Sequence, residues 1–353
     1  MSELTLSVDA MGGDHAPEIV IDGLDIARIR HPNLKFIVYG DEARITPLLA
    51  KAEDLAPLVT VRHTTETVQG DDKPSQAVRR GRNTSMWLAV DAVRQGEAQV
   101  AVSAGNTGAL MAMAKIQLRT LEGIDRPAIA SLWPTLRGES VVLDLGANLE
   151  SDATQLVEFA IMGAALARIL NGTERPTVGL LNIGTEELKG HDEIKEAAQM
   201  LREMPLSMDF RGFVEADGIS AGHMDVVVTD GFSGNVALKS AEGTARLIQA
   251  YLKDALKRTW LSRVGAVLAS TGFKVLASKL DPRAHNGGVF VGLNGLVVKS
   301  HGGTDGVGFA SAIDLAVEMA EGDIATKILN ELKKSGLKDK AEDPVEDLQQ
   351  AAP

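Results

Sequence analysis

Leu4-Thr-Leu-Ser-Val8 leads directly into Asp9-Ala-Met-Gly-Gly-Asp-His-Ala-Pro17, and an amphipathic stretch follows from residue 17 to residue 30. The first run is short and apolar, which is typical of a strand buried inside a sheet. The glycine pair permits a tight turn and a close approach of the backbone to a ligand. This strand–turn–helix unit is typical of an α/β fold, in which such units repeat along the chain.

The same alternation continues beyond this unit. Apolar runs of strand length predict strands at residues 4–8, 35–39, 59–63, 99–103, 140–143, 177–181, 224–229 and 295–299. Amphipathic stretches predict helices at residues 17–30, 85–95, 108–118, 153–170 and 193–204. The pattern predicts one doubly wound α/β domain with a mostly parallel sheet over residues 1–333, and the polar stretch 334–353 is expected to be a disordered tail.

The bulk composition excludes several classes of protein. The chain has 353 residues, a net charge of −12 and no cysteine, which excludes disulfides, cysteine–zinc sites, iron–sulfur clusters and a thiol nucleophile. Its acidity argues against nucleic acid as a partner. No basic and apolar leader is visible, and no apolar run approaches the ~20 residues that span a bilayer. We therefore expect a cytoplasmic protein, with peripheral contact at the inner membrane surface left open.

One segment, residues 239–284, departs from the alternation because it contains no strand pattern. It carries nine basic and three acidic residues, a net +6 within an acidic chain. Apolar side chains recur in it at helical spacing: Leu252, Leu256, Trp260, Val264, Val267 and Leu268. We expect a helical hairpin that packs on the core or on a dimer mate. The alternative is a basic, apolar surface for an acidic partner or for anionic lipid, and one dimeric hairpin can serve both roles.

Glycine-rich loops follow five of the predicted strands, at residues 9–17, 103–109, 144–148, 182–190 and 230–235. Ligands of an open parallel sheet bind at the carboxyl ends of its strands, so we expect these loops to lie on one edge. Glycine lets backbone N–H groups approach a ligand, and a helix that begins there adds free N–H groups and its positive end. The five loops therefore predict a shared cleft for phosphate or for a developing oxyanion.

Other common sites are absent from the sequence. There is no dinucleotide fingerprint, no P-loop and no His-Glu-x-x-His pair, and the seven histidines are scattered. Ser233 lacks the second glycine of a hydrolase nucleophile elbow because position 235 is asparagine. We therefore expect an enzyme that uses neither a metal nor a cofactor.

The five loops, in this order, resemble the motifs of the bacterial PlsX family of phosphate acyltransferases over roughly residues 4–333. The resemblance implies a three-layer α/β/α, Rossmann-like fold and a homodimer. It also implies transfer of a fatty acyl group from acyl-acyl carrier protein to phosphate, giving acyl phosphate for a membrane acyltransferase of phospholipid synthesis. Arg79-Arg-Gly-Arg-Asn-Thr-Ser-Met86 is similar to a basic segment of the family, but the lysines of that segment are replaced in this chain.

The expected chemistry is direct attack of phosphate on an activated thioester, which needs positioning and charge stabilisation rather than a covalent intermediate. Lys189, at the position of the family's motif lysine, is expected to hold phosphate, and Asn235 to donate to phosphate or to the thioester oxygen. The remaining cleft residues would be backbone N–H groups and amide side chains: Gly12, Gly13, Gly105, Asn106, Asn148, Asn182 and Gly184. Asp9 and Asp14 are expected to orient the loops.

Each of these residues also has a purely structural interpretation. Lys189 would then be a solvated loop lysine and Asn235 a helix cap. Asn106 and Asn148 would then hold turns.

An acidic carrier protein needs a basic docking surface on this acidic chain, and the predicted hairpin supplies Arg246, Lys253, Lys257 and Arg258. Three rival functions remain open: a phosphate acetyltransferase-like enzyme that uses acyl-coenzyme A, a metal- and NAD-dependent dehydrogenase of similar fold, and a non-catalytic acyl- or membrane-binding module. The dehydrogenase would need clustered aspartates and arginines that the sequence does not show. The binding module would leave the five loops without a role.

Overall fold

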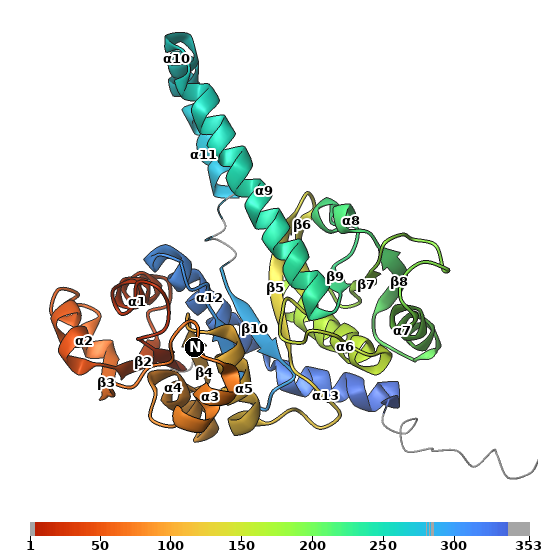
Figure 1. Cartoon of the computed structure of the whole chain (residues 1–353), viewed down its shortest axis with the longest axis horizontal. Coiled ribbons are helices and arrows are strands. Elements are labelled where there is room, and N and C mark those ends of the chain that lie inside the picture. Colours follow the sequence, from red (N-terminus) through yellow and green to blue (C-terminus); the bar gives the residue numbers. More distant parts are fainter. Residues whose placement is uncertain (1–3, 280, 282, 284–285, 338–353) are drawn as a thin grey trace, which may run out of the picture.

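The apolar runs of the sequence pair into one sheet with helices on both of its faces, and Figure 1 shows this arrangement in a computed structural model. The structure describes residues 4–279, 281, 283 and 286–337. The strands are β1 (Leu4–Asp9), β2 (Leu34–Gly40), β3 (Val59–His63), β4 (Val100–Ser103), β5 (Ala128–Thr135), β6 (Gly138–Leu143), β7 (Thr177–Leu181), β8 (Asp209–Val214), β9 (Val226–Val228), β10 (Gly288–Val291) and β11 (Leu296–Lys299). Their order across the sheet is β3-β2-β1-β4-β11-β10-β5-β6-β9-β7-β8.

Helices connect most of these strands. They are α1 (Glu18–Arg30), α2 (Glu42–Leu49), α3 (Pro74–Arg80), α4 (Ser85–Arg94), α5 (Thr107–Leu118), α6 (Ala153–Leu170), α7 (Asp192–Glu203), α8 (Ala216–Ala221), α9 (Gly231–Lys257), α10 (Trp260–Leu268), α11 (Ser270–Lys279), α12 (Gly306–Gly322) and α13 (Ile324–Ser335), with a short 3-10 turn at Ala56–Leu58. The eight predicted strands and five predicted helices are confirmed, with ends that shift by no more than two residues.

The sheet reverses its direction in the middle. β1, β2, β3, β4 and β11 are mutually parallel, but β10 runs antiparallel to both β11 and β5. β5 is also antiparallel to β6, and β6, β9, β7 and β8 are parallel to one another. The second half of the sheet therefore runs opposite to the first.

Because of this reversal, the carboxyl ends of the five strands do not all lie at the same edge of the sheet. The prediction that the five loops share one edge is therefore wrong. The loops after β1 and β4 leave one edge of the sheet, and those after β6, β7 and β9 leave the other. The error arises because β5 and β10, the antiparallel strands that cause the reversal, were not predicted.

The core lies between the sheet and the helices that cover it. α6 is its most buried helix, and a capping box joins Asp152 and Gln155 at its start. By length and composition alone α6 would qualify as a membrane span, but 78% of that stretch is buried inside the protein. We therefore read it as a core helix, whose apolar surface is covered by the sheet, α7 and α13.

α9, α10 and α11 form an arm that stands out from the rest of the molecule (Figure 1). The predicted helical character of residues 239–279 is confirmed, and most apolar side chains of the arm are exposed. The interpretation that this segment packs on the core of its own chain is wrong, because α9 meets the sheet near its base and the described residues of α10 and α11 stand away from the body. Most of the tail predicted at 334–353 lies outside the described residues, and α13 ends at Ser335.

Candidate functional site

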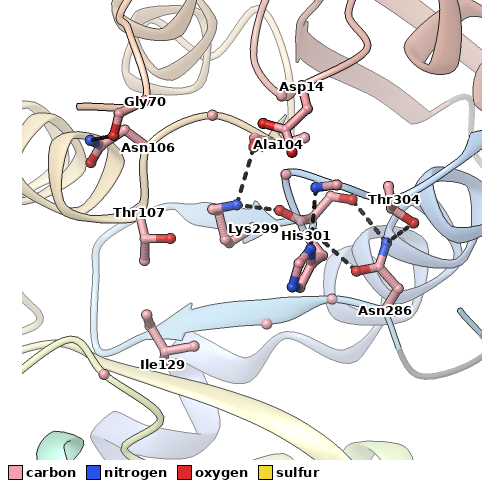
Figure 2. Close-up of a pocket in the computed structure, with 18 of the residues that line it drawn as sticks. Asp14, Gly70, Ala104, Asn106, Thr107, Ile129, Asn286, Lys299, His301 and Thr304 are labelled. Atoms are coloured by element: carbon pink, nitrogen blue, oxygen red, sulfur yellow. Dashed lines mark hydrogen bonds between the residues drawn. The ribbon is translucent and has the colours of Figure 1, made fainter. Parts of the chain in front are cut away.

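A cavity of about 1220 Å³ lies where the two halves of the sheet meet. Its lining comes from the loops after β1, β4, β6 and β11, from the segment 68–70 that precedes α3, from β5 and the start of β10, and from the first turns of α9. Figure 2 shows Lys299, His301, Asn286 and Thr304 on one side of it and Asn106 with Gly70 on another. Loops from both edges of the sheet therefore reach one cavity, although they do not share an edge.

Lys299 places an ammonium group in this cavity at the end of β11. Its Nζ donates a hydrogen bond to the carbonyl oxygen of Ala104 at 3.2 Å and another to the carbonyl oxygen of Ser300. Burial lowers the pKa of Lys299 to about 8; the charge of Lys239 acts in the same direction, while the carboxylates of Asp9 and Asp14 oppose it. The ammonium is thus the main form at neutral pH, close to its titration range.

Asn286 fixes the loop that follows Lys299. Its Nδ2 donates to Ser300 Oγ at 3.0 Å and to Thr304 Oγ1 at 3.2 Å, and its Oδ1 accepts from the backbone N–H of His301 at 2.9 Å. Gly303 N–H donates to Nδ1 of His301 at 3.2 Å. Burial, together with the charge of Lys239, lowers the pKa of His301, so the ring is neutral at pH 7 and its proton sits on Nε2. His301 therefore offers one N–H donor.

The start of α5 supplies donors from the β4 side. Asn106 caps this helix, since its Oδ1 accepts from Ala109 N–H at 2.9 Å. Its Nδ2 donates to the carbonyl oxygens of Gly70 at 2.8 Å and Asp72 at 3.2 Å, which ties the 68–72 segment to the helix. Thr107 and Gly108 line the cavity, and at the first turn their N–H groups have no intrahelical acceptor. A helix start of this kind has the free N–H groups and the positive dipole end that suit an anion.

The loop after β1 packs behind these donors. Asp9 is buried and accepts from Ser103 Oγ at 2.7 Å, and burial raises its pKa. A Cβ on Gly12 would lie 2.5 Å from Asp9 Oδ2, so only glycine allows this approach. Gly12 is not part of the lining, whereas Gly13 and Asp14 are. Asp9 thus has the orienting role expected for it.

Asp144 organises the loop after β6. Its carboxylate accepts backbone N–H groups of Ile129 at 2.9 Å, Ala147 at 3.0 Å and Asn148 at 2.7 Å, and burial raises its pKa. Asn148 Nδ2 donates to Pro127 O at 2.9 Å and to Asp144 at 3.0 Å, so its side chain holds the loop rather than lining the cavity.

Asn235, in the first turns of α9, faces the cavity beside this loop. Its Nδ2 makes only a long contact, 3.4 Å, with Leu145 O, so a ligand can compete for that donor. A Cβ on Gly146, whose φ is +123°, would lie 2.7 Å from the same Nδ2. Glycine at 146 therefore gives the Asn235 amide its room.

Lys189 lies in the loop after β7, where its side chain is exposed and is not part of the cavity lining. Asn182 Nδ2 donates to the carbonyl oxygen of Lys189 at 3.1 Å, and a Cβ on Gly190 would lie 2.2 Å from Asn182 Oδ1. Asn182 thus closes its own loop. Gly184 also lies outside the lining.

The structure brings Gly13, Asp14, Gly105, Asn106, Asn235 and Arg246 together at the cavity, and it leaves Gly12, Asn148, Asn182, Gly184 and Lys189 outside its lining. Lys253, Lys257 and Arg258 lie along the arm. The lining residues missed from the sequence include Ser131, Arg283, Asn286, Lys299, Ser300, His301 and Thr304. One signal could have found part of this set. Ser300-His-Gly-Gly-Thr-Asp305 follows a predicted strand and precedes a helix, as the five recognised loops do.

Among the described residues, no group of acidic or histidine side chains is arranged to hold a metal ion.

Comparison with known proteins identifies close relatives. Residues 4–327 match the model of a family described as "Fatty acid synthesis protein". The chain is 60% identical over 336 residues to a phosphate acyltransferase of Parvibaculum lavamentivorans, covering 95% of this chain and 93% of the relative. It is 59% identical over 324 residues to a phosphate acyltransferase of Xanthobacter autotrophicus, covering 92% and 91%.

Solved structures with the same fold are more distant in sequence. A phosphotransacetylase from Streptococcus pyogenes superposes with a TM-score of 0.58 at 18% identity, covering 93% of this chain and 94% of that one. The EutD phosphotransacetylase from Staphylococcus aureus gives 0.55 at 17% identity, covering 92% and 94%. These likenesses show the α/β/α fold expected from the sequence.

Proposed function

The chain belongs to the fatty acid synthesis protein family, the PlsX phosphate acyltransferases, and on that premise we propose that it takes a long-chain acyl group from acyl-acyl carrier protein and forms acyl phosphate. Its close relatives are named phosphate acyltransferase, and the chain is an enzyme of this class, which transfers acyl groups to phosphate. The carrier-protein donor, the acyl phosphate product and its use in phospholipid synthesis are the proposed part.

One observation carries the proposal: the cavity combines a helix start, a partly buried ammonium and an amide held by a single long hydrogen bond. The N–H groups of Thr107 and Gly108 and the Lys299 ammonium are suited to a phosphate dianion, because helix starts and cations both favour anions. The Asn235 amide and the Nε2–H of His301 are donors for the oxygen of the thioester carbonyl, on which charge develops during attack.

The step needs no covalent enzyme intermediate. A phosphate oxygen forms a bond to the carbonyl carbon, the carbon–sulfur bond breaks, and the proton of hydrogen phosphate passes to the departing thiolate. The products are acyl phosphate and the free thiol. Holding both reactants in one cavity supplies most of the required positioning. Lys189 remains the alternative cation, since the family's motif lysine falls at its position.

The cavity also has an apolar part that suits a fatty acyl chain. Met11, Val68, Ile129, Leu145 and Leu238 belong to its lining. This favours a long acyl group over the acetyl group of the rival acetyltransferase-like function.

We further propose that the arm mediates homodimerisation and transient contact with the membrane or with a membrane acyltransferase. Its exposed apolar side chains need a partner, and an acyl phosphate would be used at the membrane.

The purified protein should be incubated with palmitoyl-acyl carrier protein and phosphate, and the product trapped with hydroxylamine and identified by mass spectrometry. We expect palmitoyl hydroxamate that depends on phosphate and on enzyme, and free carrier protein in equal amount. Acetyl-coenzyme A in place of the carrier-protein donor tests the rival function. Faster turnover of acetyl-coenzyme A, or no phosphate dependence, would overturn the proposal.

A further inference from the structure

Ten residues around α3, from Lys73 to Arg82, contain four cations and no carboxylate. The side chains of Lys73, Arg79, Arg80 and Arg82 are all exposed, and none makes an ion pair with a described residue. We call these four side chains the α3 basic face. In a chain of net charge −12, these four cations form a local basic patch that no ion pair with a described residue neutralises, although Asp71 and Asp72 directly precede it.

The α3 basic face is held at the rim of the cavity. Val68, Gln69 and Gly70, which precede α3, line the cavity, and Asn106 binds the carbonyl oxygens of Gly70 and Asp72. The ring of Pro74, the first residue of α3, lies against Gly108, where a Cβ would be 2.8 Å from Pro74 Cγ. The start of α3 therefore touches the start of α5, where the phosphate donors are.

The far end of α3 is fixed just as closely. Gly81 is buried, and a Cβ there would lie 2.3 Å from Ala77 O and 2.7 Å from Met113 Cε. Arg79 lies about 8 Å along the helix from Pro74 at 1.5 Å per residue. The backbone that carries the four cations is thus held at both ends beside the cavity.

The cations of the arm are less suitable for delivering a substrate to this cavity. At its base, Lys239 and Arg246 both pair with Glu242, at 3.0 and 3.1 Å. Lys253 and Arg258 lie roughly 27 and 35 Å along α9 from Asn235, at 1.5 Å per residue. A protein bound there by charge would hold its thioester far from the reacting groups of the same chain.

We propose that the α3 basic face docks the acidic acyl carrier protein and so directs its thioester into the cavity. This inference rests on the proposed function, because it takes the carrier protein as donor. It moves the docking surface from Arg246, Lys253, Lys257 and Arg258 of the arm to α3. Charge complementarity at the rim would raise the association rate and orient the donor, while the cavity itself binds the acyl thioester.

Arg79→Glu/Arg80→Glu tests the proposal at low ionic strength. We expect the KM for palmitoyl-acyl carrier protein to rise on the order of tenfold and to lose most of its salt dependence, with the KM for phosphate unchanged. Lys51→Glu/Lys333→Glu is the matched control, because it changes the net charge equally at exposed positions away from the cavity lining. Thermal melting should show that both variants are folded.

Lys253→Glu/Lys257→Glu tests the arm in the same assay. An unchanged KM for the carrier protein in Arg79→Glu/Arg80→Glu would overturn docking at α3, and so would a rise confined to the arm variant. If the wild-type enzyme does not use palmitoyl-acyl carrier protein at all, the proposed function fails instead. These two failures are therefore distinguishable in one set of measurements.

Discussion

Lys299 and Lys189 are the two candidate cations for phosphate, and their surroundings differ. Lys299 is in the cavity and bonds two backbone carbonyls there, whereas Lys189 is exposed in a loop outside the lining. We expect Lys299→Ala to lower kcat/KM for phosphate on the order of 100-fold, since it removes a charge that the reacting phosphate needs.

Lys189→Ala is the matched variant, because it deletes the same side chain from the other loop. If Lys189 holds phosphate, as its position in the family motif implies, this change abolishes turnover, whereas its place outside the cavity lining favours a much smaller effect. Initial rates against phosphate concentration for both variants decide between the two lysines. Normal turnover in Lys299→Ala would show that Lys299 does not bind the reacting phosphate.

The pH dependence of the reaction should report the ammonium of Lys299. Its pKa is lowered to about 8 by burial, so the group is charged below that pH and neutral above it. If the charge binds phosphate, kcat/KM for phosphate should fall as the pH rises through about 8. Lys299→Arg keeps the positive charge at higher pH and should move this fall upward. An identical alkaline limb in wild type and Lys299→Arg would assign it to another group.

Single residues show where sequence reasoning reached the site and where it stopped. Asn106 and Asn235 could be found because each follows a strand-end glycine motif. Asn148 and Asn182 satisfied the same pattern, yet their amides are used within their own loops. Which amide faces a cavity depends on tertiary packing, which a motif does not contain. Asn286 follows no motif at all, because it reaches the site through the partners it finds in the Ser300–Thr304 loop.

At the scale of elements, the buried strands were predictable and the antiparallel ones were not. A parallel strand covered on both faces is a continuous apolar run, as in Val100-Ala-Val-Ser103. β5 contains Pro134 and β8 is interrupted by Gly212 with φ +84°, so neither gave that signal, and the short apolar run of β10 among glycines 287, 288 and 292 was not recognised as a strand. β5 and β10 set the direction of half the sheet. Missing them therefore misplaced three of the five loops.

The start of α9 is an element whose position controls Asn235. Gly234 packs against the loop after β6, where a Cβ would lie 2.0 Å from the carbonyl oxygen of Asp144. Because that neighbour is backbone, Gly234→Ala must shift the helix, and we expect a loss of roughly 1–3 kcal/mol in the free energy of unfolding. The same shift should move the Asn235 amide and lower kcat.

Gly243→Ala is the control within the same helix, because a Cβ there meets nothing within 4 Å. It should raise stability by up to about 1 kcal/mol through helix propensity, with kcat unchanged. Thermal unfolding and initial rates measure both effects. Wild-type stability in Gly234→Ala would show that the close approach is not needed.

At the scale of the whole molecule, the arm is the feature that the body does not account for. Trp260 is 71% exposed and Leu268 84% exposed, and further apolar side chains lie exposed along α9 at Leu247, Ile248 and Tyr251. Exposed apolar surface of this extent indicates a partner. α9 is 27 residues long, and its exposed Leu247, Ile248 and Tyr251 suit packing against a second copy. The tip at α10 combines exposed Trp260, Leu261 and Leu268 with Arg263, which suits an anionic lipid surface.

If α9 mediates dimerisation and the α10 tip binds lipid, substitutions in one should not affect the other function. Tyr251→Glu places a charge among the exposed apolar side chains of α9. It should shift the protein from dimer to monomer in sedimentation equilibrium, because an unpaired charge is costly in an apolar interface.

Trp260→Glu/Leu268→Glu should leave the dimer intact but reduce flotation of the protein with vesicles that contain phosphatidylglycerol. Binding of the wild-type protein to these vesicles should weaken as the salt concentration is raised. Vesicles of phosphatidylcholine alone are the control for the electrostatic part. If the tip variant dissociates the dimer, the tip belongs to the subunit interface. If neither variant changes mass or flotation, the exposed side chains of the arm serve another partner.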